Sequence, residues 1–159
     1  MRFGRKCWPA APKRQPSVTR ERAFVHTNLF LRYLTNDVPA QADAVEALLR
    51  RAQAGELVLV TTALVIGEIV WTLESYYQLS RDEVKTKTLA ILNTPGLEVA
   101  DSELLLQAAR WYGEKNVDFI DAYNAAWLLA NDIPMAYTFD RRHFARIEGL
   151  AVVVPGRSS

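Results

Sequence analysis

The sequence predicts an α/β fold in which a central parallel sheet is flanked by helices. Short continuous apolar segments such as Leu57–Val60 are typical of strands that are buried on both faces. One or two stretches of helical length separate consecutive strands, so the strands are expected to run parallel with right-handed crossovers. The predicted strands span residues 23–26, 57–60, 97–99, 135–138 and 151–154, and the last two are expected to close the same sheet.

Capping and turn residues delimit the predicted helices. Gly55 ends the helix before the second strand, because glycine readily adopts the left-handed conformation of a helix C-terminus. Thr61 or Thr62 can cap the following helix. Ser80 and Glu83 have the spacing of a capping box. The predicted helices span approximately residues 28–34, 41–54, 62–77, 81–93, 102–115 and 118–131.

Size and composition are those of one soluble domain of 159 residues, with 50% hydrophobic and 23% charged residues. No apolar run approaches the roughly 18 residues that a membrane span needs, and no signal peptide is visible at the N-terminus. The single cysteine, Cys7, excludes an internal disulfide and fits a reducing compartment. We therefore expect a cytoplasmic protein that does not associate with membranes.

Basic charge is concentrated at the N-terminus. Residues 1–22 contain seven basic residues against the single acid Glu21, a net charge of +6, which leaves −5 for the remainder because the whole chain carries +1. This segment also contains three prolines and few apolar residues, so residues 1–22 are predicted to be a disordered extension and residues 23–159 the folded domain. Nucleic-acid binding, a solvated tail and a start-site artefact all remain open for the extension.

Four carboxylates occupy positions that packing alone does not explain. Glu68 lies within a long apolar run, Asp118 and Asp121 open another, and Asp140 directly follows a predicted strand. Ionised carboxylates among apolar neighbours are costly unless they are hydrogen-bonded, paired or bound to metal. These acids, and His26 after the first strand, can all face the edge of a parallel sheet at the carboxyl ends of its strands, where ligands collect. The pattern indicates an acidic pocket that holds a hard divalent cation.

Structural roles compete with this interpretation. Asp118 is a natural N-cap, and the charge of Asp121 favours the dipole of the same helix. Asp140 can cap a turn. Glu68 is harder to explain structurally, because its neighbours three and four residues away on a helix are mostly apolar. His143 lies in a polar turn and is predicted to be a surface residue.

The order of these motifs resembles the PIN-domain nucleases, most closely the VapC-type toxins of toxin–antitoxin modules. The likeness extends from Ala23 to Pro155 and excludes the basic extension. It rests on the His26-Thr27-Asn28 segment, the mid-helix Glu68, the segment over residues 117–122 and the Thr138-Phe139-Asp140-Arg141 turn.

The resemblance implies a PIN-like three-layer sandwich and a metal-dependent endoribonuclease. Glu68, Asp121 and Asp140 match the catalytic acids of the family, which also bind Mg²⁺ or Mn²⁺, and Asp118 matches a frequent additional acid. Asn28 and Thr138 match supporting positions. The expected partners are an RNA substrate, a second copy of the chain in a homodimer, and a cognate antitoxin that covers the acidic site.

One position departs from the family pattern. His26 stands where the family has its first acid, so it would occupy a substituted ligand position. Imidazole is a suitable ligand for Zn²⁺, Ni²⁺ or Cu²⁺ but a poor replacement for a carboxylate in a magnesium site. Two functions therefore remain open, an endoribonuclease toxin with impaired activity and an inactive PIN scaffold that binds an antitoxin. A plain α/β protein whose acids only cap helices is a third interpretation.

Overall fold

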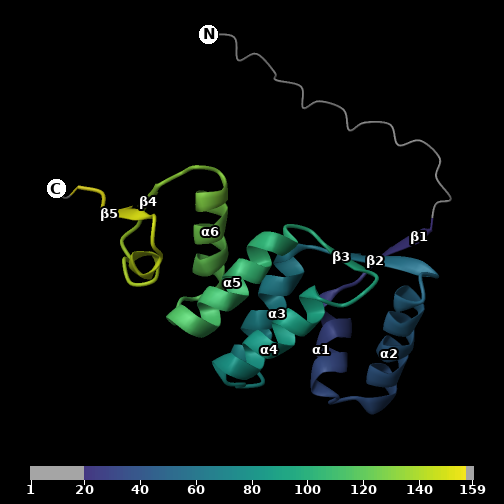
Figure 1. Ribbon diagram of the computed structural model, residues 1–159. Helices are drawn as coiled ribbons and strands as arrows, with labels where there is room; N and C mark the ends of the chain where they lie inside the picture. The colour runs from purple at the N-terminus through teal and green to yellow at the C-terminus, as the bar shows by residue number, and fades with distance from the viewer. Residues whose placement is uncertain (1–19, 157–159) are drawn as a thin grey trace, which may run out of the picture.

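The computed structural model describes residues 20–156 and has an α/β fold with a parallel sheet flanked by helices (Figure 1). The sheet contains β1 (Glu21–Phe24), β2 (Leu57–Thr61) and β3 (Leu97–Val99) in the order β1-β2-β3, and both pairings are parallel. Leu57, Leu59 and Thr61 of the central strand β2 are buried and Val58 and Val60 are partly exposed, so one face of the strand is covered more completely than the other. The predicted fold class is confirmed.

Helices fill the crossovers between these strands. Two helices separate β1 from β2, two more separate β2 from β3, and the last two follow β3. Each predicted helix is present, and its observed ends lie within about two residues of those expected, a normal margin for helix termini. The helices are α1 (Thr27–Thr35), α2 (Pro39–Gln53), α3 (Ala63–Ser75), α4 (Arg81–Leu92), α5 (Ser102–Lys115) and α6 (Phe119–Ala130).

Two predicted caps are present at the helix N-termini. The Thr62 hydroxyl accepts a hydrogen bond from the Val65 amide at 3.4 Å and caps α3. At α4, the Ser80 hydroxyl accepts from the Glu83 amide at 3.4 Å, and the Glu83 carboxylate accepts from the Ser80 amide at 2.8 Å. These bonds satisfy amides that have no acceptor within their own helix.

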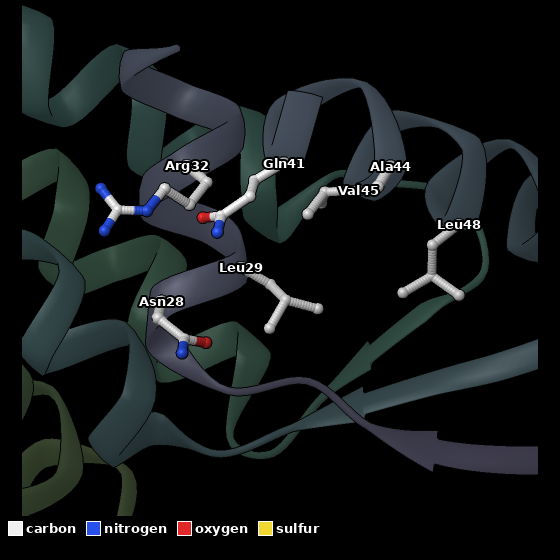
Figure 2. A pocket seen from close by; sticks show the side chains of 7 residues that line it. All are labelled: Asn28, Leu29, Arg32, Gln41, Ala44, Val45 and Leu48. Atoms are coloured by element: carbon white, nitrogen blue, oxygen red, sulfur yellow. The ribbon is translucent and has the colours of Figure 1, made fainter. Parts of the chain in front are cut away.

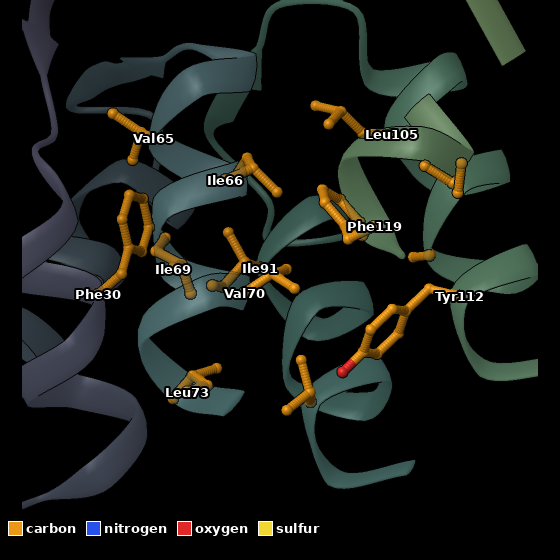
Figure 3. Close-up of a cluster of buried hydrophobic side chains, with 14 of the residues drawn as sticks. Phe30, Val65, Ile66, Ile69, Val70, Leu73, Ile91, Leu105, Tyr112 and Phe119 are labelled. Atoms are coloured by element: carbon orange, nitrogen blue, oxygen red, sulfur yellow. The ribbon is translucent and has the colours of Figure 1, made fainter. Parts of the chain in front are cut away.

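The hydrophobic core is built around α3 (Figure 3). Ile66, Ile69 and Leu73 of this helix are completely buried. Phe30 of α1 packs on one side of α3, and Phe119 of α6 belongs to the same cluster on the other side. Each such side chain contributes about 1.5–3 kcal/mol through its burial. The core therefore packs α1, α3 and α6 together, and these three helices carry Asn28, Glu68 and Asp121.

The last two strands do not join the sheet. β4 (Met135–Tyr137) and β5 (Ala151–Val153) pair with each other in parallel, with Met135 opposite Ala151, and form a separate two-stranded sheet. Figure 1 places this sheet beyond α6, at the end of the molecule opposite β1–β3. The expectation that both strands close one sheet is wrong, because an apolar strand pattern predicts extended backbone but does not define its neighbour.

The first strand includes the last two residues of the predicted extension, Glu21 and Arg22. β1 begins at Glu21, two residues before the predicted start of the folded domain. Residues 1–19 of the predicted extension, which include Cys7, lie outside the described residues. No helix within residues 20–156 is long and apolar enough to cross a membrane.

Candidate functional site

Glu68 is exposed on α3 and is held by a neighbouring hydroxyl. Thr27, the first residue of α1, is buried and donates a hydrogen bond from Oγ1 to Oε2 of Glu68. Leu64 and Trp71, on the same side of α3, are 86% and 68% exposed. The expectation of a carboxylate on a buried apolar face is therefore wrong, because this face of α3 meets solvent. The bond nonetheless joins the start of α1 to the middle of α3.

Asp118 has the structural role that its position suggests. It is the N-cap of α6, and its Oδ1 accepts hydrogen bonds from the amides of Ile120 at 2.9 Å and Asp121 at 3.4 Å. These bonds satisfy two of the amides left free at the start of the helix. The first turn of α6, which carries Asp121, is thereby ordered.

Asp121 pairs with a residue that the sequence does not single out. Nδ1 of His143 lies 2.6 Å from Oδ2 of Asp121, and the two side chains are only 24% and 32% exposed. His143 immediately precedes the short 3₁₀ helix η1 (Phe144–Arg146), which packs against α6. His143 is partly exposed, and the prediction of a surface residue did not include its contact with Asp121. Its place three residues after Asp140 was the only sequence signal for a site role.

Asp140 is exposed and stabilises its own turn. Its Oδ1 accepts a hydrogen bond from the Arg142 amide at 3.0 Å, and its own amide donates to the Thr138 hydroxyl at 3.0 Å. The Arg142 amide, followed by the Arg142 guanidinium, lowers the pKa of the Asp140 carboxyl below its ordinary value. Asp140 is therefore ionised at neutral pH.

His26 and Asn28 flank the first residue of α1 and are both exposed. His26 occupies the N-cap position, but its side chain makes no capping hydrogen bond. Its ring lies edge-on to Phe24, with the centroids 6.5 Å apart. Asn28 lines a groove between α1 and α2, about 490 Å³ in volume, in which Leu29 and Val45 are apolar and polar side chains gather at one end (Figure 2).

A second pocket brings Glu68 together with α6. It has a volume of about 460 Å³, and its lining includes Glu68, Asp101, Tyr123 and Asn124 among mostly apolar groups. Oδ2 of Asp101 accepts a hydrogen bond from the Tyr123 hydroxyl at 3.0 Å. Burial and this bond raise the pKa of Tyr123. The sequence indicates only a helix start at Asp101, so its place in the same pocket as Glu68 becomes visible only in the fold.

The oxygen donors suit Mg²⁺ or Mn²⁺ chemically, but their arrangement does not form a metal site. Within residues 20–156, no three histidine, cysteine, aspartate or glutamate side chains come close enough to hold one ion. Asp118 is occupied by amides of its own helix and Asp121 by His143. The expected convergence of the acids is therefore not present in this arrangement.

Comparison with known proteins identifies the family. No curated protein matches the chain significantly. Residues 23–150 match the PIN domain, and this matched range includes α1–α6 and every candidate acid. This match includes most of the chain, and the parallel sheet flanked by helices agrees with it. The chain therefore belongs to the PIN domain family.

Proposed function

We propose that this protein is a metal-dependent endoribonuclease toxin of a VapC-type toxin–antitoxin module. The family match over residues 23–150 carries the proposal, because PIN domains are generally nucleases that use divalent metals. Glu68, Asp121 and Asp140 are the proposed catalytic acids and metal ligands, with Asp118 as an additional acid. The location proposed for this activity is the cytoplasm.

Several of the chain's own residues support this assignment. Thr27 fixes the carboxylate of Glu68, and Asp118 orders the turn that carries Asp121. Arg141 and Arg142, next to Asp140, are exposed and can contact RNA phosphates. Metal dependence requires the acids to come closer together than they lie here, while Oδ1 of Asp121 stays available beside the contact of Oδ2 with His143.

A catalytically inactive scaffold that binds an antitoxin is the second candidate. His26 at the first acid position and the separated acids favour it. The groove between α1 and α2 offers an apolar floor and a polar end to a peptide partner (Figure 2). Homodimer formation belongs to both candidates, and the exposed Trp71 and Trp127 on α3 and α6 support it.

The two candidates are separated by restoring the first acid. Cleavage of a mixed RNA pool is measured in Mg²⁺ and in Mn²⁺ for the wild-type chain and for His26→Asp. The first candidate predicts measurable cleavage by the wild-type chain and faster cleavage by the aspartate variant, whereas cleavage by the aspartate variant alone means that His26 silences the nuclease. No cleavage by either folded protein, together with tight binding of a co-expressed antitoxin, favours the scaffold.

A further inference from the structure

An arginine from α4 binds the connection between α5 and α6. Nη1 of Arg81 donates to the carbonyl oxygens of Tyr112 at 3.0 Å and Val117 at 2.9 Å. The guanidinium carbon also lies 4.3 Å from the centroid of the Tyr112 ring, within the range of a cation–π contact. Arg81 thus holds the last turn of α5 and the residue immediately before the Asp118 cap.

A second arginine reaches the same connection from η1. Nη1 of Arg146 donates to the carbonyl oxygen of Asn116 and, at 3.4 Å, to that of Lys115. Arg146 lies three residues after His143, the partner of Asp121. The segment that follows Asp140 is therefore attached to α6 through His143 and to the connection between α5 and α6 through Arg146.

These contacts satisfy groups that the helix leaves unpaired. The last carbonyls of α5 have no amide partner within the helix, and they carry the negative end of its dipole. Only residues 116–118 connect α5 to α6, and Asn116 has a left-handed φ of 52°. A guanidinium presents several N–H donors in a fixed plane, so it can bind two carbonyls at once where a lysine ammonium acts as a point charge.

We propose that Arg81 and Arg146 are positioning residues that fix the first turn of α6 and, with it, the carboxylates of Asp118 and Asp121. The inference rests on the proposed function for its consequence in catalysis, but the positioning itself is independent of activity. Arg81 connects the acid-bearing turn to the core through α4, and Arg146 connects it to the segment after Asp140. Loss of either arginine is expected to loosen this turn while the distant sheet stays intact.

Hydrogen exchange on the full-length chain tests the positioning directly. Arg81→Gln is expected to speed amide exchange over residues 117–122 by about tenfold or more, with exchange in β2 unchanged. Local opening of this segment breaks the arginine hydrogen bonds in the wild type, so it costs less free energy in the variant. The exchange rate in Arg81→Lys is expected to lie between those of the wild type and Arg81→Gln, because an ammonium group replaces the planar guanidinium. Arg110→Gln is the matched control, because Arg110 is exposed on α5 and binds neither connection carbonyl.

Exchange over residues 117–122 that stays at the wild-type rate in Arg81→Gln overturns the proposal. If Arg81→Gln does not fold, Arg146→Gln provides the same test from the exposed side of the connection. Unchanged exchange in that variant likewise overturns the proposal.

RNA cleavage tests the consequence for catalysis. Misplaced acids lower the chemical rate more than substrate binding, so Arg81→Gln is expected to reduce kcat by about 10- to 100-fold with little change in KM. Partial recovery of kcat in Arg81→Lys supports positioning. Absence of cleavage in both the wild-type chain and His26→Asp contradicts the proposed function alone, and exchange then decides the positioning. Normal kcat in Arg81→Gln beside an active wild type overturns the catalytic consequence.

Discussion

The imidazole of His143 and the carboxylate of Asp121 join two parts of the chain that are 22 residues apart, with 2.6 Å between Nδ1 and Oδ2. This contact attaches the segment after Asp140 to the first turn of α6. It also occupies the carboxylate that the proposed nuclease needs.

Removal of this contact is expected to have a modest effect on stability. Both side chains are partly exposed, so the pair contributes about 0.2–1 kcal/mol to the free energy of unfolding. A double-mutant cycle with His143→Ala and Asp121→Asn, followed by urea denaturation, measures this coupling. Additive effects of the two substitutions would show that the contact does not stabilise the protein in solution.

The hydroxyl of Thr27 is expected to stabilise the start of α1 through Glu68. Thr27→Val keeps the buried volume but removes the donor, so we expect the free energy of unfolding to fall by about 1 kcal/mol. Urea denaturation checks this, with the exposed Thr86→Val as a control. A fall no larger than that of the control would mean that water replaces the hydroxyl without cost.

Local sequence signals predicted the helices well because their ends depend on nearby residues. The capping box of Ser80 and Glu83 and the N-cap of Asp118 were readable from side chains within three residues of each helix start. The pairing of β4 with β5 was not readable, since it depends on where α6 directs the chain. The partners of Glu68 and Asp121, which are Thr27 and His143, were missed for the same reason.

The turn between α4 and β3 requires glycine at position 96. Gly96 has a φ of +80°, and a Cβ there would lie 2.4 Å from the carbonyl oxygen of Ala52. Gly96→Ala is expected to lower the free energy of unfolding by about 2–4 kcal/mol. The backbone at Ala52 must move away from the new Cβ, and the alanine must adopt a strained positive φ. Gly55→Ala is the matched control, since φ there is +79° but the nearest atom lies 3.7 Å away in a side chain. Equal losses in urea denaturation would contradict this packing.

Stability at high pH should depend on Tyr112. Burial, followed by the nearby Glu74 carboxylate, raises the pKa of Tyr112 from 10.0 to about 12. Between these values the unfolded chain loses the phenol proton first, so the free energy of unfolding falls as pH rises. Urea denaturation measured from neutral to alkaline pH should show a smaller decrease in the free energy of unfolding for Tyr112→Phe than for the wild-type protein. Identical slopes for both proteins would contradict a raised pKa.

The most direct test of the proposed nuclease compares RNA cleavage by Glu68→Gln and Asp121→Asn with cleavage by Glu103→Gln, a matched change at an exposed acid of α5. All three are prepared in the His26→Asp background and assayed with Mn²⁺, and then with EDTA. Loss of cleavage in the first two variants and in EDTA, with full activity in the third, is the predicted result. Cleavage that survives both site substitutions, or survives EDTA, would contradict a metal-dependent nuclease built on these acids.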